Sequence, residues 1–161
     1  MRVVTWNINS VRLRINSVKK VVKKLNPDIL CLQETKCLKE DFPFEDFKKM
    51  GFVDTEAIGI KGYNGVCIAS RHPITSIDKH IFFNKDDARH MNIEFLYKNK
   101  KIIIHNFYVP AGGDEPDPKI NAKFKHKLKF LEEATKLFSN KKSAKNDLVV
   151  LVGDLNTVSY T

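Results

Sequence analysis

Three stretches of the sequence show helical patterning. Between residues 15 and 25, apolar residues recur every three or four positions and lysines largely occupy the opposite face, which is typical of an amphipathic helix. Asn26-Pro27 ends this pattern, because a residue before proline resists helical torsion angles. Residues 124–138 repeat the pattern, and the following loop extends over residues 139–146. Residues 44–50 predict a shorter helix that Gly51 stops.

Apolar stretches separated by turn residues predict β-strands. Residues 29–32 and 148–152 are apolar without alternation, as expected for strands covered on both faces. Residues 91–96 alternate, and a polar turn at 98–101 leads into the next strand. The predicted strands are residues 2–9, 29–32, 51–60, 66–70, 74–83, 91–96, 102–109 and 148–152. This order predicts an α/β layered fold, with helices covering a mixed, mostly antiparallel sheet.

Four of these strands end in a carboxylate or an amide. If the strands are neighbours, their polar ends meet along one edge of a sheet, where a hard cation and a phosphate can bind. Asp154 and Asn156 point to the same side by the period of two. An Asp can orient or deprotonate a water, while a neutral amide binds a phosphoryl oxygen. The strand-end residues are Asn7, Glu34, Asn106 with Tyr108, and Asp154 with Asn156.

Each of these residues also has an ordinary structural interpretation. Glu34 alone fits a surface glutamate, and residues 153–156 fit a β-turn. Asn7 is suited to cap the next helix, and Tyr108 to be a half-buried aromatic with its hydroxyl satisfied. Their joint occurrence at strand ends is what favours a functional site.

Composition narrows the class of protein. A chain of 161 residues suits one domain with a real core. Its net charge of +9 favours a polyanionic partner, and a lysine-rich solubilising surface explains the charge equally well. Three cysteines without a CxxC pair argue against a disulfide framework. With no signal-peptide layout and no membrane-length apolar stretch, we expect a cytoplasmic protein without a membrane partner.

Six short motifs occur in the order seen in the exonuclease III family. The stretch from Met1 to Asn156 therefore resembles these apurinic/apyrimidinic (AP) endonucleases of the endonuclease/exonuclease/phosphatase superfamily. The Tyr-Val-Pro and Gly-Gly-Asp-Glu segments point to the DNA-repair branch. The motifs are Trp6-Asn7-Ile8-Asn9, Leu32-Gln33-Glu34-Thr35-Lys36, Lys61-Gly62-Tyr63-Asn64-Gly65-Val66, Asn106-Phe107-Tyr108-Val109-Pro110, Gly112-Gly113-Asp114-Glu115 and Gly153-Asp154-Leu155-Asn156.

The resemblance implies a hydrolase that depends on Mg²⁺, with Mn²⁺ as the alternative. Its substrate would be double-stranded DNA, which it would incise at abasic sites and digest from 3′ ends. Glu34 would be the principal metal ligand, with Asn7 beside it and Asp154 and Asn156 completing the metal site. Because two carboxylates at an empty metal site repel one another, we expect at least one of Glu34 and Asp154 to have a raised pKa.

The resemblance also implies the roles around the scissile phosphate. Asp154 would orient or activate the attacking water. Asn156 would hold the phosphate and contact the DNA, and Tyr108 would assist in positioning it. Arg89 matches a family arginine near the DNA backbone, and a surface ion pair with Asp86 or Asp87 explains this arginine equally well.

The family domain continues beyond the last residue of this sequence. Its second half carries a second sheet, a further metal-site Asp and a Ser-Asp-His motif, and none of the five histidines here follows a Ser-Asp pair. We expect residues 1–161 to form a single incomplete domain, the N-terminal half of a four-layer α/β-sandwich, with one apolar sheet face uncovered. A frameshift, a premature stop or a split gene would produce such a chain.

Three functional interpretations remain open. The first is a repair nuclease that is impaired alone and needs a separately encoded C-terminal half or self-association. The second is a non-catalytic DNA-binding remnant. The third is a superfamily phosphodiesterase or phosphatase acting on a small phosphorylated ligand, against which the Gly-Gly-Asp-Glu segment and the basic charge weigh.

Overall fold

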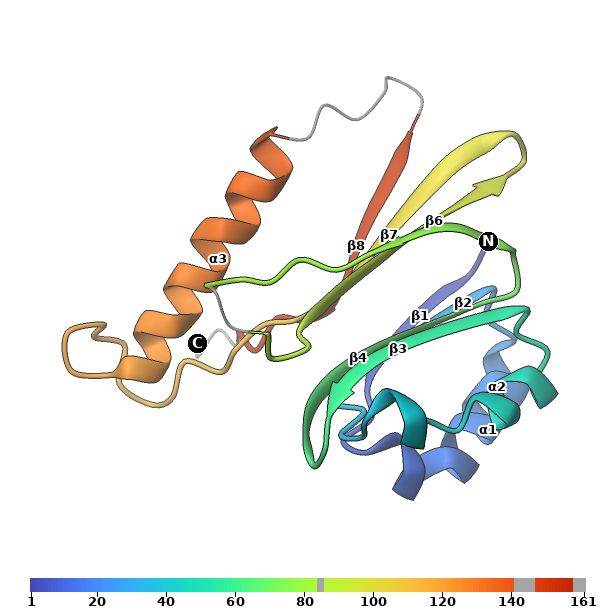
Figure 1. The fold of residues 1–161 in the computed structure, drawn as a ribbon, viewed down its shortest axis with the longest axis horizontal. Helices are drawn as coiled ribbons and strands as arrows, with labels where there is room; N and C mark the ends of the chain where they lie inside the picture. Colours follow the sequence, from blue (N-terminus) through green and yellow to red (C-terminus); the bar gives the residue numbers. More distant parts are fainter. Residues whose placement is uncertain (84–85, 141–146, 158–161) are drawn as a thin grey trace.

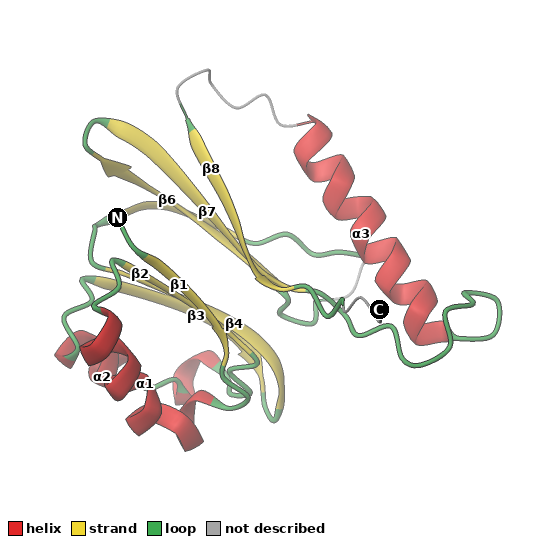
Figure 2. Cartoon of the chain, turned by 180° about the vertical axis from the view of Figure 1, so that it is seen from behind, coloured by secondary structure: helices red, strands yellow, loops and turns green. Residues whose placement is uncertain are grey.

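The computed structural model describes residues 1–83, 86–140 and 147–157. They form two four-stranded sheets that pack face to face, with helices on both outer sides (Figures 1 and 2). The first sheet has the order β1-β2-β4-β3, and the second has the order β5-β6-β7-β8. The strands are β1 (Val3–Asn7), β2 (Ile29–Gln33), β3 (Asp54–Ile60), β4 (Tyr63–Ser70), β5 (Ile74–Asp78), β6 (His90–Tyr97), β7 (Lys100–Tyr108) and β8 (Leu148–Asp154).

Each sheet contains one parallel pair of strands, and its other pairs are antiparallel. In the first sheet β1 runs parallel to β2, with Asn7 opposite Gln33. In the second sheet β7 runs parallel to β8, with Tyr108 opposite Asp154. Because parallel strands end together, each pair presents two carboxyl ends at one place. These strand ends carry most of the polar residues singled out in the sequence.

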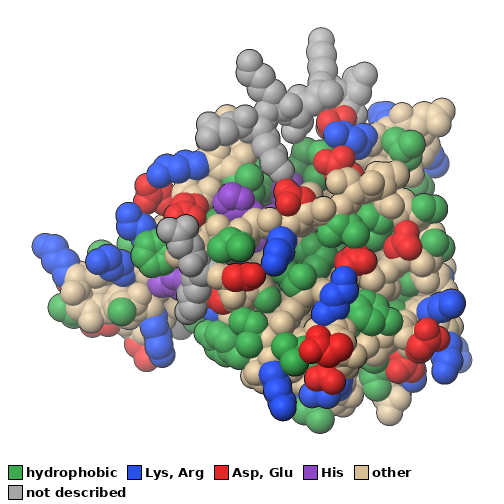
Figure 3. Space-filling model, viewed as in Figure 1, with side chains coloured by type: hydrophobic (Ala, Val, Ile, Leu, Met, Phe, Trp, Pro, Cys, Tyr) green, Lys and Arg blue, Asp and Glu red, His purple; other side chains and the backbone are tan. Residues whose placement is uncertain are grey.

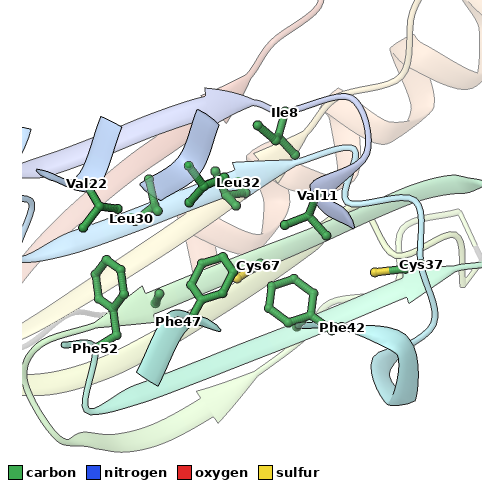
Figure 4. Close-up of a cluster of buried hydrophobic side chains, with 13 residues drawn as sticks. Ile8, Val11, Val22, Leu30, Leu32, Cys37, Phe42, Phe47, Phe52 and Cys67 are labelled. Carbon is green, nitrogen blue, oxygen red and sulfur yellow. The ribbon is translucent and has the colours of Figure 1, made fainter. Parts of the chain in front are cut away.

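Helices cover the outer face of the first sheet. The segments are α1 (Val11–Leu25), the short 3₁₀ helix η1 (Lys39–Asp41) and α2 (Phe44–Lys49). Figure 4 shows the rings of Phe42, Phe47 and Phe52 facing aliphatic side chains of α1 and β2. Phe47 is fully buried among them. This layer is a dry apolar core of the kind that supplies most of a domain's stability.

A second core fills the space between the sheets, and a third lies under α3 (Ala122–Asn140). The inter-sheet core joins side chains of β2 and β4 to side chains of β6 and β7. The α3 core joins Phe107 and Val109 to Phe130 of the helix and to Phe82. The chain therefore builds all four layers: helices, sheet, sheet and helix.

The four-layer α/β arrangement confirms the predicted fold class. The expectation that this chain lacks a second sheet, and so leaves one sheet face uncovered, is wrong. The buried runs of β2 and β7 gave no indication that they belong to different sheets. Their side chains pack against each other across the inter-sheet core.

Several element boundaries differ from the predicted ones. α1 begins at Val11, ahead of the periodic stretch, and is kinked at Arg14. The predicted strand 74–83 ends at Asp78, beyond which Phe82 turns inward against the α3 core. The predicted 139–146 loop starts as the last turn of α3, and residues 141–146 lie outside the described residues.

Charge on the surface is mixed. On the face drawn in Figure 3, Lys and Arg side chains lie interspersed with Asp and Glu. Of the helices within the described ranges, none is long and apolar enough to cross a membrane.

Candidate active site

Side chains from the ends of both sheets converge on one amide. The Nδ2 atom of Asn7, at the end of β1, lies 2.7 Å from Oε1 of Glu34, which follows β2. The same nitrogen lies 2.7 Å from Oδ2 of Asp154, at the end of β8. The predicted meeting of polar strand ends therefore occurs, but across the two sheets of the sandwich rather than along one edge of a single sheet.

Glu34 is held as a charged carboxylate. Besides Asn7, the hydroxyl of Tyr108 donates to its Oε1 at 2.9 Å, and Nζ of Lys36 lies 2.9 Å from its Oε2. Burial raises the pKa of Glu34, but the hydrogen bonds from Asn7, Lys36 and Tyr108 and the charge of Lys36 outweigh it, so the pKa is lowered. Glu34 therefore does not carry the raised pKa expected for a repelling carboxylate pair.

Tyr108 is fixed between a carboxylate and a guanidinium. Burial and the hydrogen bond to Glu34 raise its pKa to about 12, so the hydroxyl remains a donor. The guanidinium of Arg89 lies 4.7 Å from the centre of the Tyr108 ring. Nε of Arg89 pairs with Asp87 at 2.6 Å, and both residues are buried. The predicted ion pair thus exists with Asp87, and it lies inside the protein rather than on its surface.

The turn after β8 sets the position of Asp154. Gly153 has a φ of 144°, and a Cβ there would lie 1.9 Å from the Phe107 carbonyl oxygen, so a side chain has no room. Asn156 adopts the left-handed region, with a φ of 47°. Its backbone N–H donates to Oδ1 of Asp154 at 2.9 Å, and its side-chain Nδ2 donates to the Val109 carbonyl at 2.7 Å. Asn156 therefore shapes the turn that presents Asp154.

Asn106 has a different place from the one its position at a strand end suggested. It is fully buried, and its Oδ1 accepts a hydrogen bond from Gln33 Nε2 at 2.6 Å. Its Nδ2 donates to the carbonyls of Leu32 and Cys67, both at 2.9 Å. Asn106 thus links the two sheets through hydrogen bonds, two residues before Tyr108 along β7.

The donor set suits a hard cation. Carboxylate and amide oxygens are the ligands that Mg²⁺ prefers, and two carboxylates already approach the single Asn7 nitrogen. The Asn7 amide stands where both carboxylates converge, with its Oδ1 accepting from the Asn9 N–H at 3.1 Å. Among the described residues, His, Cys, Asp and Glu side chains nowhere form a group of three that could hold a metal. A cation at this place would be bound by the carboxylates of Glu34 and Asp154, and Asn7 would join them through its Oδ1 once its amide group turns over.

An open groove of about 430 Å³ adjoins the site. Its lining includes Tyr63, Arg89 and Tyr108, together with Lys123 and His126 of α3. The guanidinium of Arg89 is steadied by the hydroxyl of Tyr63, at 3.3 Å from its Nη2. The groove offers aromatic rings and cations next to the Tyr108 hydroxyl.

Sequence reasoning missed two lysines that contact the site. Lys36 was noticed only as part of a motif, yet it neutralises Glu34 and also donates to Asn9 Oδ1 at 2.6 Å. Lys127 of α3 is buried and contacts the Asp154 turn through Asn156 and Thr157. Its position among exposed lysines of a basic helix gave no signal.

The family of the chain follows from comparison with known proteins. Residues 4–159 match the sequence profile of the endonuclease/exonuclease/phosphatase family, and the chain belongs to that family. Exodeoxyribonuclease III of Haemophilus influenzae is 26% identical over 158 residues, covering 97% of this chain and 57% of that protein. The DNA-(apurinic or apyrimidinic site) endonuclease of Dictyostelium discoideum is 25% identical over 166 residues, covering all of this chain and 43% of that protein.

Solved structures agree with this assignment. An AP endonuclease from Archaeoglobus fulgidus superposes with a TM-score of 0.83 at 32% identity, covering 97% of this chain and 58% of that one. The 3′–5′ exonuclease NExo of Neisseria meningitidis superposes with a TM-score of 0.79 at 29% identity, covering 96% and 57%. The resemblance to AP endonucleases is confirmed, and the chain spans little more than half the length of these relatives.

Proposed function

We propose that this chain carries the acidic centre of a Mg²⁺-dependent nuclease that cleaves double-stranded DNA at abasic sites and from 3′ ends. The observation that carries the proposal is the convergence of Glu34 and Asp154 on one nitrogen of Asn7, at 2.7 Å each. Relatives named exodeoxyribonuclease III and AP endonuclease support the substrate class.

The residues divide the work of phosphodiester hydrolysis. Glu34 and Asn7 would hold the cation, which would neutralise charge on the phosphate. Asp154 would orient the attacking water and accept its proton, since the Asn156 N–H already fixes one of its oxygens. Tyr108 keeps its proton and donates it to Glu34 Oε1, so it would assist in positioning the phosphate by fixing the carboxylate that holds the cation. Asn156 would act through its hold on Asp154, and would contact the phosphate if its side chain leaves Val109.

The groove beside Tyr108 would accept the DNA backbone. Arg89 and Lys123 supply positive charge there, and the rings of Tyr63 and Tyr108 supply flat surfaces. Positive side chains near phosphates release condensed counterions, so binding should weaken steeply as salt increases.

A cleavage assay on a duplex with one abasic site tests the activity, with Mg²⁺ and with EDTA. Glu34→Gln and Asp154→Asn should each lower the rate by about 10²–10³-fold, the size seen when one transition-state contact is removed. The matched controls are Glu45→Gln and Asp78→Asn, which make the same chemical changes at exposed positions outside the six motifs. Equal rates in site and control variants would refute the assignment.

The same assay separates the alternatives. Cleavage of a 3′-phosphate end without incision of the abasic site would favour a phosphatase, the activity named for a Neisseria relative that is 26% identical. Salt-sensitive DNA binding without metal-dependent cleavage would identify a binding protein.

We also propose that a further polypeptide segment completes this domain. Within the described residues, β1 and β8 have a hydrogen-bonded neighbour on one side only, and the two strands lie against each other. About two-fifths of the chain of the Archaeoglobus relative lies outside the part that this chain covers. Leu151 of β8 is 54% exposed, as expected for a surface that another segment covers.

Mixing this chain with the part of the Archaeoglobus relative that it does not cover tests the proposal by size-exclusion chromatography. A complex should form, and Leu151→Lys should weaken it, since a lysine on an edge strand opposes pairing. A homodimer of this chain that excludes the added segment would refute it.

A further inference from the structure

Lys127 is a buried cation that the proposed chemistry leaves without a role. It lies on α3, far in sequence from the strand-end motifs, and is 8% exposed. Burial of a lysine ammonium is unfavourable unless its protons are bound. Here Nζ contacts three oxygens of one short segment: the carbonyls of Leu155 at 3.4 Å and Asn156 at 2.5 Å, and the hydroxyl of Thr157 at 3.1 Å.

These three oxygens belong to the turn that presents Asp154. The Thr157 hydroxyl donates its own proton to the Leu155 carbonyl at 2.9 Å, so it meets Lys127 as an acceptor. The ammonium therefore closes the turn from its carbonyl side. The Asn156 N–H shares a peptide unit with the Leu155 carbonyl and points the opposite way, where it donates to Asp154 Oδ1.

The backbone of Asn156 makes this contact matter. Its left-handed conformation is one that L-residues rarely adopt, and it turns the N–H toward Asp154 and the carbonyl toward α3. A cation on that carbonyl favours this conformation over extended alternatives. Without it, the N–H that orients the Asp154 carboxylate loses its support.

α3 is itself fixed relative to the site. Oδ1 of Asn121 caps its first turn by accepting from the backbone N–H groups of Lys123 and Phe124, at 3.0 and 3.3 Å. Nδ2 of Asn121 donates to the Gly112 carbonyl at 2.8 Å, in the loop that follows β7. Phe130 anchors the next turn in the α3 core. The helix is therefore fixed both before and after Lys127, by Asn121 and by Phe130.

We infer that Lys127 is a positioning residue that holds the Asp154–Asn156 turn in its working conformation through the carbonyls of Leu155 and Asn156. The geometric part concerns the turn alone. The catalytic consequence rests on the proposed nuclease function, since it acts through the Asp154 carboxylate.

Amide hydrogen exchange of the ¹⁵N-labelled protein tests the geometric part. Lys127→Met keeps the length of the side chain and removes its charge and donors. The Asn156 N–H should then exchange at least about tenfold faster, because loss of hydrogen bonds to a charged group opens the turn. Lys127→Arg should restore most of the protection. Lys125→Met, on the exposed side of the same helix, should leave the rate unchanged.

Thr157→Val provides a second variant should Lys127→Met fold poorly, since Thr157 is exposed and its loss removes one of the three oxygens. Faster exchange at Asn156 is expected here too. Exchange at Asn156 that stays within about twofold of wild type in both variants would overturn the inference.

Kinetics tests the catalytic part. In the abasic-site assay, Lys127→Met should lower kcat by about tenfold with KM nearly unchanged, because the turn orients the water-activating group rather than binding DNA. A rise in KM of about tenfold would instead make Lys127 a DNA-binding residue and overturn its positioning role. If wild type fails to cleave DNA, the proposed function falls, while the exchange data still decide whether Lys127 holds the turn.

Discussion

The two helix-covered faces of this sandwich bury different kinds of side chain. Under α1 and α2 the first sheet meets an almost purely aliphatic and aromatic core. Under α3 the second sheet buries a smaller apolar cluster, and polar groups lie beside it. The His90 and His105 rings are in contact there at 2.9 Å between Nε2 and Nδ1, and Lys127 is buried one layer further out.

The apolar face mainly stabilises the fold, whereas the face with buried polar groups mainly fixes the geometry of the elements around it. Apolar burial is non-directional and contributes stability in proportion to area, which suits the face that only has to hold the fold. Buried polar groups require defined partners, so they fix geometry more than they add free energy. The face with polar groups is the one whose helix reaches the Asp154 turn.

The largest effect on stability should come from the apolar face. Phe47→Ala removes a fully buried ring from the centre of that core and should lower the free energy of unfolding by about 3–5 kcal/mol. Urea denaturation measures it. Leu13→Ala on α1, where the leucine is 82% exposed, should change it by less than about 0.5 kcal/mol. If Phe47→Ala lowered the free energy of unfolding as little as Leu13→Ala does, the α1–α2 layer would not be the main core.

Phe130→Ala tests the other face and should cost less, about 2–3 kcal/mol, because the cluster under α3 is smaller. The loss should be local, with amides of α3 exchanging faster while those of β2 and β4 stay protected. Uniformly faster exchange in all strands would show that the two faces unfold as one unit, and the contrast between them would fail.

Between the faces, the inter-sheet amides should have an intermediate effect. Asn106→Ala removes the side-chain donor of the Leu32 and Cys67 carbonyls and one of the three acceptors of the Gln33 amide, and should cost about 2 kcal/mol. A double-mutant cycle with Gln33→Ala should show a coupling near 1 kcal/mol. If the two single losses simply add in the double variant, the hydrogen bond between Gln33 and Asn106 contributes no free energy of its own. Asn16→Ala, on the exposed side of α1, serves as the control.

The smallest effect concerns Glu34 and depends on pH. Its lowered pKa means that ionised Glu34 stabilises the fold above its ordinary value of 4.5, and that this contribution is lost as the pH falls through the lower folded value. With EDTA present, Glu34→Gln should cost at most about 1 kcal/mol at pH 7, since the side chain is partly exposed. The difference from wild type should shrink as the pH falls below 4.5 and Glu34 takes up its proton. A variant more stable than wild type at pH 7 would contradict the lowered pKa.

The sequence predicted which polar strand-end residues lie together better than it predicted the sheets. Asn7, Glu34, Tyr108 and Asp154 were recognisable because each ends an apolar strand, and a strand end is a local property. Which strands pair is not local: β2 is buried along its whole length, and such a run fits a central strand of either sheet. Residues on helices were the hardest to find.

Lys127 illustrates why. It differs from neighbouring lysines only in the turn that it meets, and that turn lies at the far end of the chain. Asn106 was misplaced because it lies two residues before Tyr108, on the same face of β7 but further from the strand end. Tyr108, the last residue of the strand, reaches Glu34, whereas Asn106 bonds to Leu32 and Cys67 inside the inter-sheet core.

The hairpin between β6 and β7 gives this protein a convenient point of attachment. Lys98 and Asn99 form its tip with φ angles of 50° and 61°, and Lys98 is exposed. β7 runs from Lys100 to Tyr108, so the tip lies about 26 Å from the acidic centre. All three native cysteines are buried. A cysteine introduced by Lys98→Cys would thus be the thiol most open to a fluorophore or a surface linker, and the protein could be tethered or tracked with its acidic centre left clear.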